Sequence, residues 1–575
     1  MRLLGKKAFS AALVLGALCA GGMTCAAPLT RNLIPTYASP QHDVIYTSTR
    51  QINSLTVTPN GTLWAATSGG ILECDTRGTC RKWTRRDGLP SHEIQRIGVA
   101  DNLVTAQTPL GRATYQNGKW HSEKSHTADV VSSTRKLGGE TKKSQNAPAK
   151  NAPAKSVANA PEISVMWRGR QVTARIDGLH IGDGRMTRAM DLPPSRGSHI
   201  SALLPRGDAL WVALFGDGLW QYDNKKWTAI DVDLPTAARD ITALAEDVKR
   251  SILWVGTRRD GIWRFAEKTK RWTQHLQPDE PFDHNIQNLA IFGSQLWLST
   301  LEDGAVTNAT VGWARATPPQ MSSVAPRHMV QFRGAFYVRN GDGKVDCYDG
   351  RTWARDVFKA LPRRKVTALV VDGAHLYAAQ WGGWSEWDGA RWTHFLQIPE
   401  LQGLPPMSLL PDGDTLWIGT QSRGLFEYSK RTQKLRLHDE RLGLPDDWIT
   451  CLARIGDTVY AGTFVGGLAF YVIDKEAAPK WVSLSQLHGE NVTALADDRR
   501  GGVFAATRHG MWHKTADGGV KKVAGDFALD EEAQALCVVP QGLWIGTRTG
   551  LFFVTNATIA ASSATRAGVT QGGKS

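Results

Sequence analysis

The chain has 575 residues, a formal net charge of +14 and a hydrophobic content of 42%. A chain of that length rarely folds around one core, so we expect several domains or an array of repeats. The positive charge favours weak attraction to anionic surfaces. The sequence contains no long basic run and no nucleic-acid recognition motif, which argues against a nucleic-acid-binding protein.

Residues 1–26 have the layout of a secretory signal peptide, with a short basic start, an apolar run over residues 8–20 and small residues at the end. The apolar run has about 13 residues, whereas a membrane-spanning helix needs roughly 20. No later segment reaches that length without charge, so we expect no transmembrane segment. The mature chain is therefore predicted to be periplasmic or secreted, and a lipid anchor at Cys19 or Cys25 is the alternative.

After an N-terminal segment at residues 27–51, a repeat of about 42 residues dominates the chain. Each copy predicts four short strands, because β-branched and aromatic residues are separated by Gly, Asp and Asn turns and no helical period is sustained. Many such copies are typical of β-propeller blades, which stack side by side and close into a ring. We therefore predict an all-β fold of about twelve four-stranded blades, with the recurrent Trp residues packed between them. The anchor of the second strand recurs at Trp64, Val104, Val172, Trp211, Trp254, Trp297, Tyr337, Tyr377, Trp417, Tyr460, Phe504 and Trp544.

Twelve blades exceed the usual four to eight of one ring. The Pro-rich segment at residues 317–326 lies between the sixth and seventh copies, so we predict two six-bladed rings, a first propeller at residues 52–316 and a second at residues 317–556. A seven-plus-five split and one large ring are the alternatives. The last copy lacks its own fourth strand, and a segment at about residues 43–49 or about residues 317–325 is expected to supply it.

Two segments are predicted to be disordered. Residues 122–161 are polar, nearly free of aromatic residues and contain the sequence NAPAK twice in tandem. This composition favours a disordered surface loop inserted into the first propeller. The tail at residues 557–575 is also expected to be disordered.

The cysteines indicate one disulfide. Cys74 and Cys80 bracket a turn-rich stretch and could face each other across a hairpin, so we predict that they pair, with two unpaired thiols as the alternative. Cys451 and Cys537 fall in apolar strand patterns, where a buried and inert thiol is expected. No Cys/His cluster has the spacing of zinc ligands, so we expect neither a metal nor a cofactor.

The repeat resembles a known family. Residues 416–428 (LWIGTQSRGLFEY) and 543–552 (LWIGTRTGLF) are similar to the two-component regulator propeller repeat, and residues 87–94 (DGLPSHEI) and 442–449 (LGLPDDWI) are similar to its linker between blades. The resemblance implies an extracellular or periplasmic sensor propeller of a signalling protein, often one that senses carbohydrate. No kinase or regulator region follows the repeats, so the chain resembles the sensor part alone.

Residues that break the repeat in the loops between the second and third strands, or between blades, are the candidate ligand-binding residues. By analogy with other propellers, we expect these loops to surround one mouth of each ring. Arginines there could hold an anionic ligand through charge-assisted hydrogen bonds, or each could be a solvated turn residue. Trp381 replaces a small polar turn residue and is the best candidate for a stacking platform. The complete set is Arg258, Arg259, Arg423, Arg508, His509, Arg548, Trp381, Phe215, Phe464 and Trp448.

No motif for catalysis accompanies these residues, because the sequence has no nucleophile elbow, no Walker loop and no His-Glu-x-x-His. We therefore predict no catalytic residues and a non-catalytic binding or scaffold module. Its partner is expected to be an acidic saccharide or a protein, in a signalling context. A propeller hydrolase or lyase that acts on polysaccharide is one alternative, and a structural assembly subunit is the other.

Overall fold

The computed structural model describes residues 40–561, apart from residues 78, 101–102, 125–162, 176, 184–185, 195–198, 231–233, 277–284, 302, 309–312, 324, 364, 474–478 and 524–531. Within this part of the chain the strands form twelve four-stranded sheets, and in eleven of them the strand order follows the sequence. The predicted all-β fold of twelve propeller blades is confirmed. The predicted signal peptide lies outside the described residues, as does the predicted insertion except for its first three residues, which continue a strand.

The first five blades, numbered 1 to 5, take four consecutive strands each. Their strands are β2 (Ile52–Val57), β3 (Leu63–Thr67), β4 (Gly70–Cys74), β5 (Cys80–Trp83), β6 (Arg96–Ala100), β7 (Leu103–Thr108), β8 (Gly111–Gln116), β9 (Lys119–Lys124), β10 (Ile163–Trp167), β11 (Arg170–Arg175), β12 (Gly178–Gly182), β13 (Thr187–Met190), β14 (Ile200–Arg206), β15 (Ala209–Leu214), β16 (Gly218–Tyr222), β17 (Trp227–Ala229), β18 (Ile241–Asp247), β19 (Ile252–Thr257), β20 (Ile262–Ala266) and β21 (Arg271–Leu276).

Blades 6 to 12 follow, and the last of them also uses the first strand of the chain. Their strands are β22 (Ile286–Phe292), β23 (Gln295–Thr300), β24 (Ala305–Asn308), β25 (Trp313–Ala316), β26 (Pro326–Phe332), β27 (Ala335–Asn340), β28 (Val345–Tyr348), β29 (Trp353–Ala354), β30 (Val366–Asp372), β31 (His375–Gln380), β32 (Gly383–Trp387), β33 (Trp392–Phe395), β34 (Pro406–Asp412), β35 (Thr415–Thr420), β36 (Leu425–Ser429), β37 (Lys434–His438), β38 (Ile449–Ile455), β39 (Thr458–Thr463), β40 (Leu468–Val472), β41 (Lys480–Ser483), β42 (Val492–Asp497), β43 (Val503–Thr507), β44 (Gly510–Lys514), β45 (Val520–Lys522), β46 (Ala533–Val539), β47 (Gly542–Thr547), β48 (Gly550–Thr555) and β1 (Val44–Thr47).

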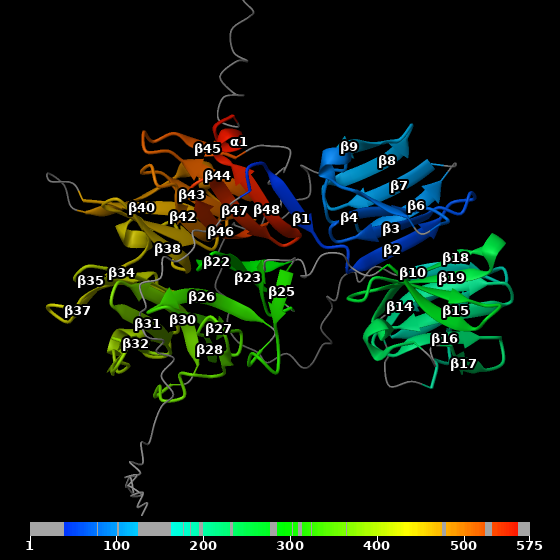
Figure 1. The fold of residues 1–575 in the computed structure, drawn as a ribbon, viewed down its shortest axis with the longest axis horizontal. Helices are drawn as coiled ribbons and strands as arrows, with labels where there is room; N and C mark the ends of the chain where they lie inside the picture. The colour runs from blue at the N-terminus through cyan, green and yellow to red at the C-terminus, as the bar shows by residue number, and fades with distance from the viewer. Residues whose placement is uncertain are drawn as a thin grey trace, which may run out of the picture.

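Contacts between first strands show where each ring closes. β18 packs against β2, and β46 packs against β22. Where the first ring closes, Gly256 of β19 packs so closely against Ile52 of β2 that a Cβ added to the glycine would lie 2.4 Å from Ile52 Cγ2. Where the second ring closes, a Cβ added to Gly546 would lie 2.6 Å from Ile286 Cγ2. Blades 1 to 5 therefore form one ring and blades 6 to 12 form another, and Figure 1 shows the two rings side by side.

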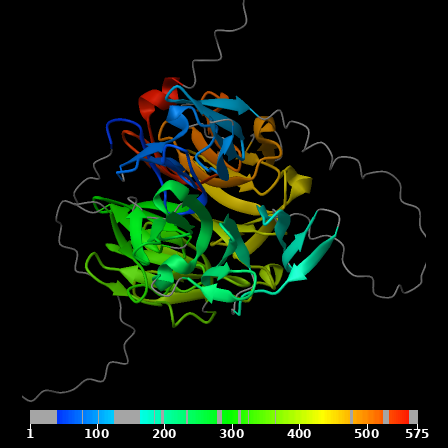
Figure 2. The ribbon, with the colours of Figure 1, turned by 90° about the vertical axis from the view of Figure 1, so that its right-hand side faces the viewer.

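The prediction of two six-bladed rings is wrong, and so is the predicted boundary at residue 317. The first ring ends at β21, and the sixth repeat opens the second ring because its first strand packs against the last repeat and not against the first. The Pro-rich segment at residues 317–326 lies between two blades of the same ring. In Figure 2 the blue and cyan strands of the five-bladed ring lie in front of the seven-bladed ring.

The seven-bladed ring is completed by a strand from the N-terminal segment. β1 pairs antiparallel with β48, with Tyr46 opposite Leu551. The prediction that a segment at about residues 43–49 supplies the missing strand is confirmed, and the alternative segment at about residues 317–325 is wrong. Because β2 begins the other ring directly afterwards, the chain crosses between the rings at residues 48–51 (Figure 1).

The chain continues beyond the last strand as α1 (Asn556–Ala561). Ile559 is buried and belongs to the same apolar cluster as Phe552 and Val554. The predicted disorder of the tail from residue 557 is therefore wrong for residues 557–561, and the rest of the tail lies outside the described residues. Among the residues that the structure describes, no helix is long and apolar enough to cross a membrane.

The core lies between blades, as the repeat predicts. All twelve anchors of the second strands are buried. Trp64 of blade 1, for example, packs against Trp120 of blade 2 with ring centroids 5.8 Å apart. The predicted disulfide is confirmed, because Cys74 and Cys80 are bonded across the β4–β5 hairpin.

Candidate functional site

In eight of the twelve blades the second strand ends in a threonine that fixes the loop after it. In blade 9 the buried Thr420 hydroxyl donates to the Gly424 carbonyl at 2.8 Å and accepts the Arg423 amide at 3.0 Å. Gly424 has a φ of 68°, in the left-handed region that favours glycine, and a Cβ there would lie 2.3 Å from the His438 carbonyl oxygen. The Thr-x-x-x-Gly spacing therefore presents residue 423 on an ordered turn. Thr257 makes the same bond to Gly261, whereas the hydroxyls of Thr507 and Thr547 donate to glycine carbonyls three residues on, at Gly510 and Gly550.

Two of the predicted aromatic residues form one platform on blade 10. Trp448 and Phe464 stack with ring centroids 4.1 Å apart and planes 15° apart. The Asp446 carboxylate accepts the amides of Trp448 at 3.0 Å and Val465 at 2.8 Å, which ties the segment before β38 to the β39–β40 loop. Phe464 is 38% exposed, so the platform presents apolar surface to solvent.

The third predicted aromatic residue, Trp381, lies on the turn between β31 and β32 of blade 8. It is 43% exposed, whereas Trp384 in the next strand is fully buried. The Arg363 guanidinium donates to the Trp381 backbone carbonyl and so stabilises this turn. Because the ring packs little against its own blade, its face is open to a ligand.

The predicted arginines of the seven-bladed ring stand on three further blades. Arg423 of blade 9 donates to the Glu400 carbonyl at 3.1 Å. Arg508 of blade 11 is exposed, and its guanidinium contacts no partner among the described residues. Its neighbour His509 lies 3.1 Å from a Glu490 carboxylate oxygen. Arg548 of blade 12 is exposed on the equivalent loop.

The remaining predicted residues belong to the five-bladed ring. Phe215 of blade 4 contacts the His199 ring at 6.2 Å between centroids, and the Arg258 guanidinium lies 5.8 Å from the Phe215 centroid. Arg258 and Arg259 both follow β19 of blade 5. Phe215 and Arg258 therefore come together, with Arg259 next to Arg258 in the chain, but on the other ring from Trp381, Arg423 and Phe464.

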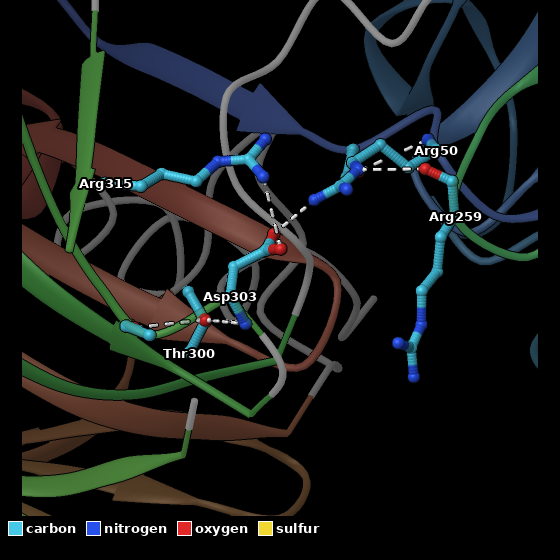
Figure 3. Close-up of polar contacts among 7 residues, drawn as sticks. Arg50, Arg259, Thr300, Asp303 and Arg315 are labelled. Atoms are coloured by element: carbon cyan, nitrogen blue, oxygen red, sulfur yellow. Dashed lines mark hydrogen bonds and ion pairs between the residues drawn. The ribbon is translucent and has the colours of Figure 1, made fainter. Parts of the chain in front are cut away.

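A cavity of about 330 Å³ lies between the two rings and brings Arg258 and Arg259 together with Arg548. It is also lined by Arg50, Glu93 and Asp303, so that four arginines face two acids. Arg50 donates to the Asp303 carboxylate of blade 6 and to the Arg259 carbonyl, the latter at 3.3 Å. Arg315 lies 3.4 Å from the same carboxylate, as Figure 3 shows. The predicted arginines are thus divided between this cavity and the mouth of the seven-bladed ring.

Arg50 and Asp303 were not found from the sequence, although both line this cavity. Arg50 lies in the segment that joins the rings, and Asp303 precedes a glycine in the turn position that Asp260 occupies in blade 5. In the sequence alone, neither residue differs from the solvated residues of the other loops. Their pairing depends on how the rings meet, for which no local sequence signal exists.

The channel of the seven-bladed ring is a larger cavity of about 570 Å³. Its walls come from the first strands of all seven blades, and Trp448 of the aromatic platform also lines it. The platform and the channel therefore form one continuous surface at the mouth of this ring. A cavity of this size is within the range of small-molecule sites in proteins.

No protein-family model matches the chain, and no curated protein is similar to it in sequence. Among solved structures, the extracellular domain of a hybrid two component system from B. thetaiotaomicron is 12% identical, with 91% of this chain and 82% of that chain covered and a TM-score of 0.27. PorZ, a surface component of the type-IX secretion system of Porphyromonas gingivalis, is 14% identical, with 90% and 87% covered and a TM-score of 0.34. Virginiamycin B lyase from Staphylococcus aureus is 9% identical over 48% of this chain and 96% of its own, with a TM-score of 0.39. With TM-scores of 0.27 to 0.39, these matches support no conclusion about fold, ligand or activity.

Proposed function

We propose that this chain is a periplasmic or secreted, non-catalytic binding module that holds an anionic saccharide across the mouth of its seven-bladed ring. One observation carries the proposal. Aromatic and cationic side chains alternate on consecutive blades around the channel, with Trp381 on blade 8, Arg423 on blade 9, Trp448 and Phe464 on blade 10 and Arg508 on blade 11.

This arrangement matches the chemistry of an acidic sugar chain. The apolar faces of sugar rings pack on exposed aromatic rings, and a carboxylate or sulfate group accepts charge-assisted hydrogen bonds from guanidinium groups. The excess of basic residues in the chain adds a long-range attraction for a polyanion. Because successive blades alternate the two kinds of side chain, an extended ligand would meet both along its length.

The signal-like residues 1–26 and the resemblance of the repeat to sensor propellers are the reasons to place this binding outside the cytoplasm and in a signalling context. The module would bind its ligand and pass the bound state to a protein partner. Neither step needs a catalytic group.

Titration calorimetry of the mature chain tests the proposal with an α-1,4-linked galacturonate tetramer and the same tetramer fully methyl-esterified. The ester keeps the sugar rings and removes the charge, so we expect only the acid to bind. Replacing Arg423 and Arg508 together with serine should weaken binding at least about a hundredfold, because each lost bond to a charged group is worth about 1.5–3 kcal/mol. Phe464→Ala should weaken it about three- to tenfold.

Arg431→Ser is the matched control. Arg431 is exposed on the turn between β36 and β37, which lies at the opposite end of blade 9 from the Arg423 loop because successive hairpin turns alternate between the two ends of a sheet. This variant should bind like the wild type. Equal binding of the acid and its ester, or unchanged binding by the double arginine variant, would contradict the proposal.

A further inference from the structure

Blade 7 departs from the repeat inside its strands and not only in its loops. Arg339 stands two residues after the anchor Tyr337 in β27. Every other blade has glycine, alanine or serine at this position, and these residues are Ala66, Ala106, Ala174, Ala213, Gly256, Ser299, Ala379, Gly419, Gly462, Ala506 and Gly546. A side chain with a guanidinium group therefore occupies a position at which all other blades have a small side chain or none.

The small residues at this position lie against the next blade. A Cβ at Gly419 would lie 2.7 Å from Ile449 Cγ2, the first residue of the next inner strand. The Arg339 side chain instead lines the channel, and its Nε donates to the Val366 carbonyl of blade 8 at 2.9 Å. One hydrogen bond thus fixes the side chain, while its terminal nitrogens make no hydrogen bond to the residues that the structure describes.

A second arginine of the same blade lines the same channel. Arg327 occupies the position in β26 where Thr367, Thr450 and Thr493 stand in their blades, and it lines the cavity like Arg339. It donates to the Gln287 side-chain carbonyl of blade 6. Gln287 donates in turn to the Gln534 side chain of blade 12 at 2.6 Å. Amide side chains from two other blades therefore hold this guanidinium at the channel wall.

The two charges are not balanced inside the channel. Among the described residues that line the cavity there is no Asp or Glu. Burial and the neighbouring Arg327 lower the pKa of Arg339 to about 10, and Asp342, which pairs with Lys344 at 2.8 Å outside the lining, offsets this only in part. His328, directly opposite Arg339 in the sheet, has its pKa lowered to about 3 by burial and by both guanidinium groups, so it is neutral.

Half-buried cations without a counter-charge are costly unless a ligand supplies one. We propose that Arg327 and Arg339 form an oxyanion-binding site on the channel wall of blade 7, which takes a carboxylate, phosphate or sulfate group. Such a group can accept two or more hydrogen bonds from the two guanidinium groups. The oxyanion can be free or borne by a sugar acid, and only the sugar-borne source rests on the function proposed above.

Calorimetry with small probes tests this site separately from the mouth of the ring. The probes are D-glucuronate, D-glucose and inorganic phosphate, and the variants are Arg339→Ala and Arg327→Thr. Both substitutions install the residue that other blades use at the same position, so the blade should still fold. We expect glucuronate and phosphate to bind the wild type, either variant to weaken both at least tenfold, and glucose not to bind.

Thermal unfolding gives a second readout. Phosphate should raise the melting temperature of the wild type and of the exposed-turn control Arg431→Ser, but not that of Arg339→Ala. Without phosphate, Arg339→Ala should melt no lower than the wild type, because it removes an unbalanced charge. Failure of glucuronate and phosphate to bind the wild type, or equal binding by the variants, would overturn the site.

The two probes also separate this proposal from the proposed function. Binding of phosphate without glucuronate would establish a site for free oxyanions and exclude the sugar-borne source. Loss of glucuronate binding in Arg339→Ala, together with a galacturonate tetramer that never binds, would keep the channel site and refute saccharide binding across the mouth.

Discussion

Replacing Tyr46 with alanine should open the seven-bladed ring, because Tyr46 is the main aromatic contact of the strand that completes it. The Tyr46 ring lies edge-on to Trp313 with centroids 5.5 Å apart and stacks on Trp544 with centroids 6.4 Å apart. Loss of about 100 Å² of buried surface costs about 2.5 kcal/mol at about 25 cal/mol per Å², and each aromatic contact adds about 0.5 kcal/mol. We therefore expect a loss of about 3–4 kcal/mol in the free energy of unfolding, which agrees with typical large-to-small aromatic substitutions.

Thermal unfolding of the mature chain measures this loss. For a ring of this size about 3–4 kcal/mol corresponds to a decrease of about 10 °C in melting temperature. Tyr46→Phe is the matched control, since it keeps the ring and should cost less than about 1 kcal/mol. Hydrogen exchange should also increase in β48, which pairs with β1. If the alanine and phenylalanine variants melt within about 2 °C of each other, β1 does not close the ring as described.

Three further predictions concern other parts of the molecule. Asp303→Asn should lower the free energy of unfolding, measured by urea titration, by about 1–3 kcal/mol, because it weakens the ion pairs with Arg50 and Arg315. A change under about 0.5 kcal/mol would contradict the role of the Arg50–Asp303 pair as a bridge between the rings. Replacing Cys74 with serine should cost about 2 kcal/mol, and a reducing agent should lower the wild-type melting temperature to that of the variant and leave the variant unchanged. The pKa of His328 is lowered to about 3, so this group stabilises the fold above pH 6.5 and the contribution is lost as the pH falls toward 3. The stability of His328→Gln should therefore depend less on pH between about 7 and 4 than that of the wild type. Parallel profiles of stability against pH would contradict this.

The blades could be predicted from the sequence, but their partition into rings could not. The period of the repeat and its buried anchors define each blade locally. Ring closure uses the same repeat positions as every other contact between neighbouring blades. Ile286 packs against Gly546 where the ring closes, and Ile449 packs against Gly419 in the same way between two blades that are consecutive in the chain. Because the two kinds of contact share one pattern, the sequence contains no sign of where a ring ends.

The candidate site was partly predictable for a similar reason. Trp381, Arg423 and Phe464 interrupt the repeat in loops, where such departures are easy to see, and the structure places all three on one ring. Arg339 interrupts it just as clearly within a strand, and comparing the strand positions of all twelve copies would have found it. Arg50 and Asp303 could not be found this way, because their pairing depends on the contact between the rings.

A glycan array probed with the mature chain tests the central claim most directly. The array should pair each acidic glycan with a neutral form of the same sugars. We predict that the bound glycans carry carboxylate or sulfate groups, that their neutral partners are not bound, and that the signal falls as salt is raised from low to physiological concentration. Equal binding of neutral and acidic members of the pairs, or no binding to any acidic glycan, would contradict the account.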